Sequence, residues 1–120
     1  LRQIGQPEAA IAQYEKAIEI NPNLAETYNN LGITLARMGK TVEAIAQYKK
    51  SLEINPNKIN ALNNLAGAYV QVKQFKDAIP LLQKALALAK AAGDESQARG
   101  IATNLEMIKQ SADSVQQDSR

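Results

Sequence analysis

The sequence predicts an all-α fold: an α-α superhelix, or solenoid, of antiparallel helix pairs with a 34-residue period and a C-terminal capping helix. Residues 10–23 return at residues 44–57, where AIAQYEKAIEINPN becomes AIAQYKKSLEINPN and eleven of fourteen positions are identical. Apolar residues inside each unit recur at the spacing of one helix face. Because self-similarity at such a period is typical of stacked helical repeats, we expect each unit to pack mainly on its neighbours.

The composition fits a folded helical chain and disfavours several classes of partner. Of 120 residues, 45% are hydrophobic and 4% aromatic, and the net charge is +2 with no block of Lys and Arg. A nucleic-acid partner is therefore not expected. No apolar run approaches the roughly 20 residues of a membrane span, so we expect no membrane partner either.

Two residue types that carry much of protein chemistry are absent. The chain contains neither Cys nor His, which removes the commonest general base, thiolate chemistry and the usual ligands of zinc and copper. We therefore expect no catalytic residue, no metal site and no cofactor, and we interpret the chain as a non-enzyme.

Residues 1–24 are interpreted as a partial first unit that contains mainly its second helix. Leu1 aligns with Leu35 one unit later, so the first unit begins inside its first helix. The second helix is expected over residues 7–20, and Pro22 ends it because proline lacks the amide donor and clashes with the preceding turn. The apolar face of this helix would be exposed at an open N-terminal edge.

Residues 25–58 are predicted to form a complete unit, a pair of helices. The first helix is expected over residues 25–38, followed by Gly39, which can adopt the left-handed conformation of a helix cap. The second helix is expected to end near residue 54, before Pro56. The apolar faces of the two helices consist of Tyr28, Leu31, Gly32 and Leu35, and of Val42, Ile45, Tyr48 and Leu52.

Residues 59–92 are predicted as a third unit whose second helix is longer than the others. Lys90 stands where Pro22 and Pro56 end the earlier units. The helix that begins at Phe75 is therefore expected to continue to about residue 92.

Residues 93–110 are predicted as a capping helix and residues 111–120 as a polar, frayed tail. Asn104 aligns with Asn64 at a separation of 40 instead of 34, which indicates a spacer of six extra residues. Glu106 stands where the earlier units carry a small residue that allows close packing. We therefore expect no further helix to pack on that face of the capping helix.

Small residues occupy the positions where the two helices of a unit would cross, and close helix approach requires them there. They are Gly32, Ala44 and Ser51, and one unit later Ala66, Ala78 and Ala85. Taken with Leu31, Leu35, Tyr48 and Pro56, this spacing resembles the tetratricopeptide repeat. The resemblance extends over about residues 1–92.

The resemblance implies a function for one surface. The first helices of such units line a concave groove that binds peptides, so we predict a protein–protein interaction scaffold that holds an extended peptide or a partner helix. The residues predicted to face this groove are Asn29, Asn30, Ile33, Arg37, Asn60, Asn63, Asn64, Gln71 and Asn104.

Asparagine dominates the predicted groove, and its amide offers both an acceptor and two donors. A column of Asn30, Asn64 and Asn104 could therefore hold the main chain of an extended peptide with little regard to its sequence. The arrangement is similar to the asparagine ladder of some tetratricopeptide arrays, including that of a protein-glycosylating transferase. In the alternative interpretation these residues are solvated, or they bond to neighbouring helices and set the superhelix.

Three further interpretations remain open. Capture of a C-terminal carboxylate by basic residues is disfavoured. Such a clamp would need Lys or Arg at positions that hold Glu26, Asn60 and Asn64, and only Arg37 and Arg2 offer positive charge. The chain could be the substrate-recruiting arm of a larger enzyme, such as a glycosyltransferase, with the catalytic domain outside this sequence. It could also self-associate through the N-terminal edge. The residues do not identify the partner or the location, although the cytoplasm is slightly favoured.

Overall fold

The structure is a computed structural model that describes the backbone of residues 5–118 and the side chains of residues 5–115. Within that range the chain forms α-helices and no strand, which confirms the predicted all-α solenoid. The helices are α1 (Gly5–Ile20), α2 (Ala25–Arg37), α3 (Thr41–Ile54), α4 (Ile59–Gln71), α5 (Phe75–Ala91) and α6 (Glu95–Asp118).

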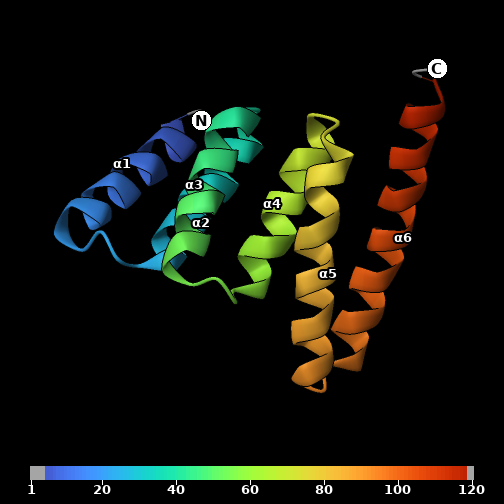
Figure 1. Ribbon diagram of the computed structural model, residues 1–120. Helices are drawn as coiled ribbons and strands as arrows, with labels where there is room; N and C mark the ends of the chain where they lie inside the picture. The colour runs from blue at the N-terminus through green and yellow to red at the C-terminus, as the bar shows by residue number, and fades with distance from the viewer. Residues whose placement is uncertain (1–4, 119–120) are drawn as a thin grey trace.

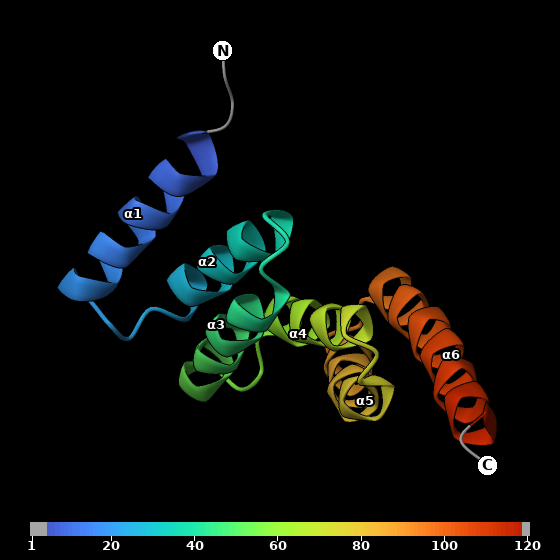
Figure 2. The ribbon, with the colours of Figure 1, turned by 90° about the horizontal axis from the view of Figure 1, so that it is seen from above.

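Consecutive helices pack side by side and form a continuous array (Figure 1). Seen from above, α2, α4 and α6 follow one another along one side of the array, and α3 and α5 lie along the other (Figure 2). We call the side that carries α2, α4 and α6 the groove face. Each helix of this face is separated in sequence from the next by one helix of the opposite face.

Two Asn-Pro-Asn turns separate the units. The backbone N–H of Asn23 donates to Oδ1 of Asn21 over 3.1 Å, and the N–H of Asn57 donates to Oδ1 of Asn55 over 3.2 Å. Such side-chain bonds two residues along the chain stabilise a turn. The turns end α1 and α3 at the limits that the prolines predict, and α2 and α5 each end one residue before their predicted limits.

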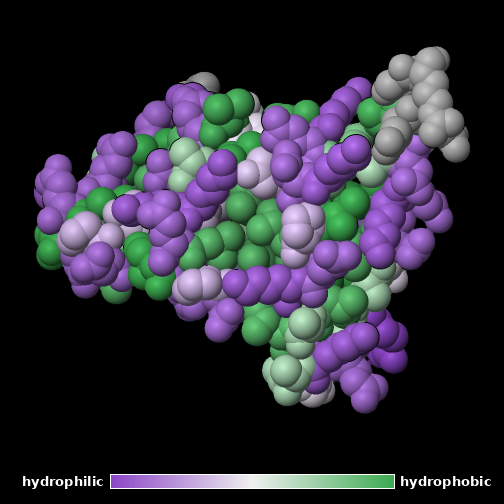
Figure 3. Space-filling model, viewed as in Figure 1, coloured by the Kyte–Doolittle hydropathy of each residue, from purple (hydrophilic) through white to green (hydrophobic). Residues whose placement is uncertain are grey.

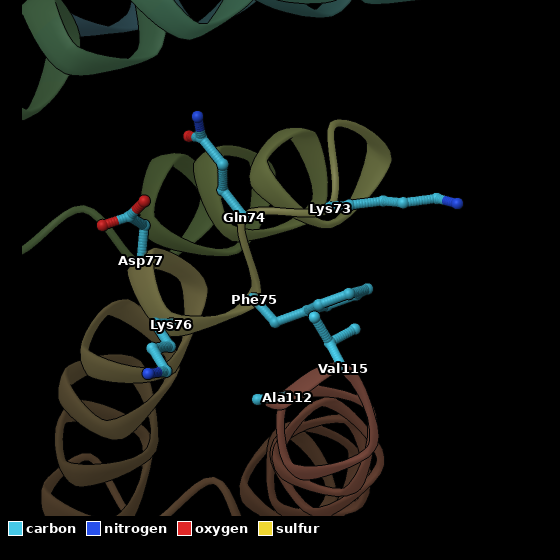
Figure 4. Close-up of a pocket in the computed structure, with 7 residues that line it drawn as sticks. All are labelled: Lys73, Gln74, Phe75, Lys76, Asp77, Ala112 and Val115. Carbon is cyan, nitrogen blue, oxygen red and sulfur yellow. The ribbon is translucent and has the colours of Figure 1, made fainter. Parts of the chain in front are cut away.

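The last helix corrects one expectation. We expected α6 to end near residue 110 and the tail to fray, but the helix continues to Asp118. Its added turns have apolar contacts, because Ala112 is buried and the Phe75 ring points toward Val115 (Figure 4). The polar composition of the tail concealed these two apolar residues, three positions apart on one helix face.

The α2–α3, α4–α5 and α5–α6 turns share one backbone geometry. The helix is closed by a residue with positive φ, which is +81° at Gly39, +62° at Lys73 and +76° at Gly93. In each case the next residue donates its N–H back to the preceding helix. These bonds run from Lys40 to Leu35 over 2.9 Å, from Gln74 to Tyr69 over 2.8 Å and from Asp94 to Ala89 over 3.0 Å.

The core consists of two clusters of buried side chains, one mainly between α2 and α3 and the other between α4, α5 and α6. Three partly buried residues belong to both clusters: Leu52 of α3, Tyr69 of α4 and Leu81 of α5. The units are therefore joined by a continuous apolar contact. On the face seen in Figure 3, hydrophobic side chains reach the surface in the middle of the array within a border of hydrophilic ones.

The helices α2 and α3 approach each other closely at Gly32. A Cβ atom at this position would lie 2.5 Å from the ring of Tyr48, which leaves no room for a side chain. The next unit has Ala66 in place of Gly32 and the smaller Leu82 in place of Tyr48, and both are buried in one cluster. The two units therefore fill the same crossing with different pairs of residues.

Ser51 adds a polar tie at the same crossing. Its side chain is fully buried, and its hydroxyl donates to the backbone carbonyl of Ala25 over 2.8 Å. This bond satisfies the hydroxyl and fixes the start of α2 against the end of α3. Ala85 occupies the equivalent position one unit later and has no group to make such a bond.

We expect Gly32→Ala to destabilise the fold by about 1–3 kcal/mol, because overpacking against the Tyr48 ring outweighs the better helix propensity of alanine. Adding Tyr48→Leu recreates the pair of the following unit and should recover much of this loss. Urea denaturation of the two single variants and the double variant measures the coupling. Simple additivity of the two changes would contradict this packing argument.

Lys73 carries the same left-handed backbone as Gly39 but has a side chain, which is unfavourable there. Lys73→Gly should therefore stabilise the protein by about 1 kcal/mol, seen as a higher Tm in calorimetry. Gly39→Lys is the reciprocal control and should lower Tm. An unchanged or lower Tm for Lys73→Gly would contradict the prediction.

Candidate functional site

The groove face is hollowed between α2 and α4. A hollow of about 360 Å³, which we call the polar hollow, lies between these helices. Its lining residues carry mostly carboxamide groups. They are Glu26, Asn29, Asn30 and Ile33 of α2, and Asn60, Asn63 and Asn64 of α4.

Two further hollows adjoin the same face. The central hollow, about 360 Å³, lies between the α2–α3 turn and α4, and its lining includes Thr41, Tyr48 and Gln71. The apolar hollow, about 380 Å³, lies between α4 and α6. Its lining residues are Asn63, Ala66, Gly67, Val70, Gln71, Phe75, Leu82, Asn104, Met107, Ile108 and Ser111.

Asn63 lines all three hollows. Its Oδ1 atom is shielded from solvent and accepts no hydrogen bond from the part of the chain that the structure describes. A buried acceptor without a partner is unfavourable, so native structures contain few of them. Asn63 is therefore a polar residue shared by all three hollows, with one buried acceptor that has no hydrogen-bond partner among the described residues.

Asn29 and Asn64 form a hydrogen bond across the boundary between two units. Nδ2 of Asn64 donates to Oδ1 of Asn29 over 3.0 Å, and the residue Asn29 is only 3% exposed. Asn29 thus supports Asn64 from inside and offers a ligand little surface. Asn64 keeps its own Oδ1 and one N–H for other partners.

The remaining residues predicted for the groove are divided among the hollows. Asn30, Ile33 and Asn60 lie together at the polar hollow. Gln71 lines the central and apolar hollows, and Asn104 lines only the apolar hollow.

Arg37 does not join this set. It lines a separate hollow of about 400 Å³ between α1 and α2, together with Tyr14. The sequence prediction also omitted the α6 side chains Met107, Ile108 and Ser111, which line the apolar hollow.

The three hollows carry little charge. Among their lining residues Glu26 is the only one with a charged side chain, and Lys58 forms an ion pair with it. Burial raises the pKa of Tyr48 above its usual value and Arg37 partly offsets this, so the phenol stays neutral. Arg2, the other basic residue considered for an anion clamp, lies outside the described residues.

The described residues contain neither a candidate metal site nor a candidate membrane span. They contain no group of three or more acidic, His or Cys side chains arranged to hold a metal ion. None of the described helices has the length and apolar character needed to cross a membrane.

A profile described as tetratricopeptide repeat matches residues 23–91, more than half of the chain. The chain belongs to the tetratricopeptide repeat family. A second profile, described as TPR repeat, matches residues 1–39. No curated relative matches the chain.

Solved structures share the fold of this tetratricopeptide array. The TPR2B domain of yeast Sti1, in complex with pHsp70, is 28% identical with a TM-score of 0.80, over 88% of this chain and 85% of that one. The TPR2AB domain of Sti1, in complex with pHSP90, is 28% identical with a TM-score of 0.77, over 86% and 40% of the two chains. PcrH, in complex with the chaperone binding region of PopD, is 20% identical with a TM-score of 0.79, over 89% and 81%.

The Asn29–Asn64 bond generates a prediction about stability. Asn29→Ala and Asn64→Ala should each destabilise the array, and their double-mutant cycle should give a coupling of about 1 kcal/mol. Asn63→Ala is the matched control at the position one unit after Asn29. Because Oδ1 of Asn63 has no partner, its removal should cost less than that of Asn29; an equal or greater cost would argue against this account.

Proposed function

We propose that this tetratricopeptide array is a protein-interaction module that binds an extended polypeptide segment along the groove face. The observation that carries the proposal is the set of carboxamide groups around the polar hollow, where Asn30, Asn60 and Asn64 lie together. Each carboxamide can accept and donate, which matches the alternating N–H and C=O groups of an extended main chain.

The hydrogen bond from Asn64 to Asn29 supports this function because it orients a groove residue before any ligand arrives. A side chain that is already held loses less rotamer freedom on binding. The two interpretations of the asparagine row are thus compatible: Asn29 sets the contact between units, and Asn64 presents its remaining groups to a segment in the groove.

The low charge of the hollows defines the kind of recognition. With Glu26 paired to Lys58 and no basic side chain among the lining residues, the groove presents no cationic side chain that would anchor a carboxylate. Binding through neutral hydrogen bonds depends weakly on ionic strength, whereas binding through exposed charges weakens as salt rises. We therefore expect main-chain recognition that tolerates many sequences.

The similarity to Sti1 agrees with an interaction module. The TPR2B and TPR2AB structures of Sti1, each 28% identical to this chain, are complexes with pHsp70 and pHSP90. The fold is therefore used for binding in proteins of comparable sequence. The choice of the asparagine row over the rest of the surface comes from the lining of the polar hollow in this chain.

The proposal is tested with peptides selected on the wild-type chain from a random-sequence display library. Asn30→Ala together with Asn64→Ala should weaken binding of the selected peptides by about ten-fold or more, since two hydrogen bonds to the main chain are lost. Calorimetric titration at low and high salt measures the affinity.

Asn29→Ala is the control for this test. It removes the same inter-helix bond as Asn64→Ala but takes little surface from the groove, so it should lower Tm with a smaller effect on affinity. The proposal fails if the double variant binds as the wild type does. A steep loss of affinity with salt would replace it with a charge-based mode of binding.

A further inference from the structure

Gly67 lies in the middle of α4, yet the fold does not require a glycine there. Its backbone is helical, and a Cβ atom would meet nothing within 4 Å. Gly32 is different, because the ring of Tyr48 occupies the space of its missing side chain. Since glycine weakens a helix interior relative to alanine, Gly67 is a local loss of stability that no packing contact explains.

The space over Gly67 belongs to two hollows. Gly67 lines both the central and the apolar hollow, whereas Ile33, at the same position one unit earlier, places its side chain at the polar hollow. Because Gly67 has no side chain where Ile33 has one, the groove over α4 is left open at this position. A position without a side chain allows another molecule to approach the backbone closely.

The walls of the apolar hollow suit a hydrocarbon group. Ala66, Val70 and Leu82 form its inner side, and Phe75, Met107 and Ile108 enclose it from α5 and α6. Met107 is 59% exposed, and its flexible thioether side chain can adjust to different shapes. The lining includes no charged side chain, and its volume of about 380 Å³ lies within the range of ligand pockets.

The contact between α4 and α6 differs from the contact between α2 and α4. Asn29 and Asn64 close the earlier crossing with a hydrogen bond. The equivalent residues at the later crossing are Asn63 and Asn104, where the six-residue spacer intervenes, and here Oδ1 of Asn63 has no partner among the described residues. The later crossing therefore lacks the hydrogen bond that closes the earlier one.

We propose that the apolar hollow over Gly67 is a socket for one bulky apolar side chain of the bound polypeptide segment. The occupant is part of the same segment, because Asn63 lines both this socket and the polar hollow. This inference rests on the proposed function and adds an apolar anchor to main-chain recognition.

Gly67→Ile tests the socket by introducing the residue that the preceding unit carries. A Cβ atom at this position would meet nothing within 4 Å, and isoleucine favours a helix more than glycine does, so the variant should keep or raise Tm. Gly67→Ala is a smaller second variant for the same purpose. Gly100→Ile on α6 is the matched control, since Gly100 also has open space over its Cα and lines none of the three hollows.

The readout is binding of the library-selected peptides, with each apolar residue of a peptide replaced by alanine in turn. One such replacement should weaken binding to the wild type by about ten-fold or more. Gly67→Ile should cause a similar loss, and the peptide replacement should then have little additional effect. Gly100→Ile should leave affinity unchanged.

The outcomes separate the two proposals. The socket proposal is overturned if the peptides bind Gly67→Ile as tightly as the wild type and if no alanine replacement of an apolar peptide residue weakens binding. Main-chain recognition would still hold in that case. Selection that yields no binding peptide overturns both. If Gly100→Ile weakens binding as much as Gly67→Ile does, the loss comes from a general change in the array, and the socket proposal is also overturned.

Discussion

The contact of Gly32 with the Tyr48 ring is the constraint on which the arrangement of the complete unit depends. It brings α2 close to α3, and the buried Ala44 and Ser51 keep the same crossing narrow. With the pair fixed at this separation, Leu52, Tyr69 and Leu81 connect the two core clusters. The groove face is a consequence: the residues of α2 and α4 that do not pack in these clusters are presented together on one side.

The fold could be predicted almost entirely from the sequence because its determinants are local and repeated. Prolines in the Asn-Pro-Asn turns, glycine caps and small residues at the crossings act within one unit. The 34-residue period repeats most of them, although Lys73 replaces Gly39 and Lys90 replaces Pro56. The end of α6 was predicted wrongly because it depends on Phe75, which is far away in the sequence. The sequence of a polar stretch gives little indication that it is helical when the contact that stabilises it comes from one ring far away in the chain.

The groove was less predictable, for a related reason. The sequence identifies which residues lie on one side of a helix, but how deeply each residue is buried depends on the neighbouring unit. Asn29 and Asn30 are adjacent, yet Asn29 is buried against Asn64 while Asn30 lines the polar hollow. Arg37 lies on the same predicted stripe but faces α1. The apolar hollow arises from the spacing of α4 and α6, which no single helix specifies.

Burial is distributed unevenly along the array. None of the described side chains of α1 is fully buried, whereas the cluster around α4, α5 and α6 includes Ala78, Ala85 and Ala89 with no exposed surface. In a one-dimensional stack, each helix pair owes much of its protection to its neighbours. Local opening should therefore begin at α1 and reach α4 last, so the surface around Asn63 keeps its shape through fluctuations that already unfold the first helix.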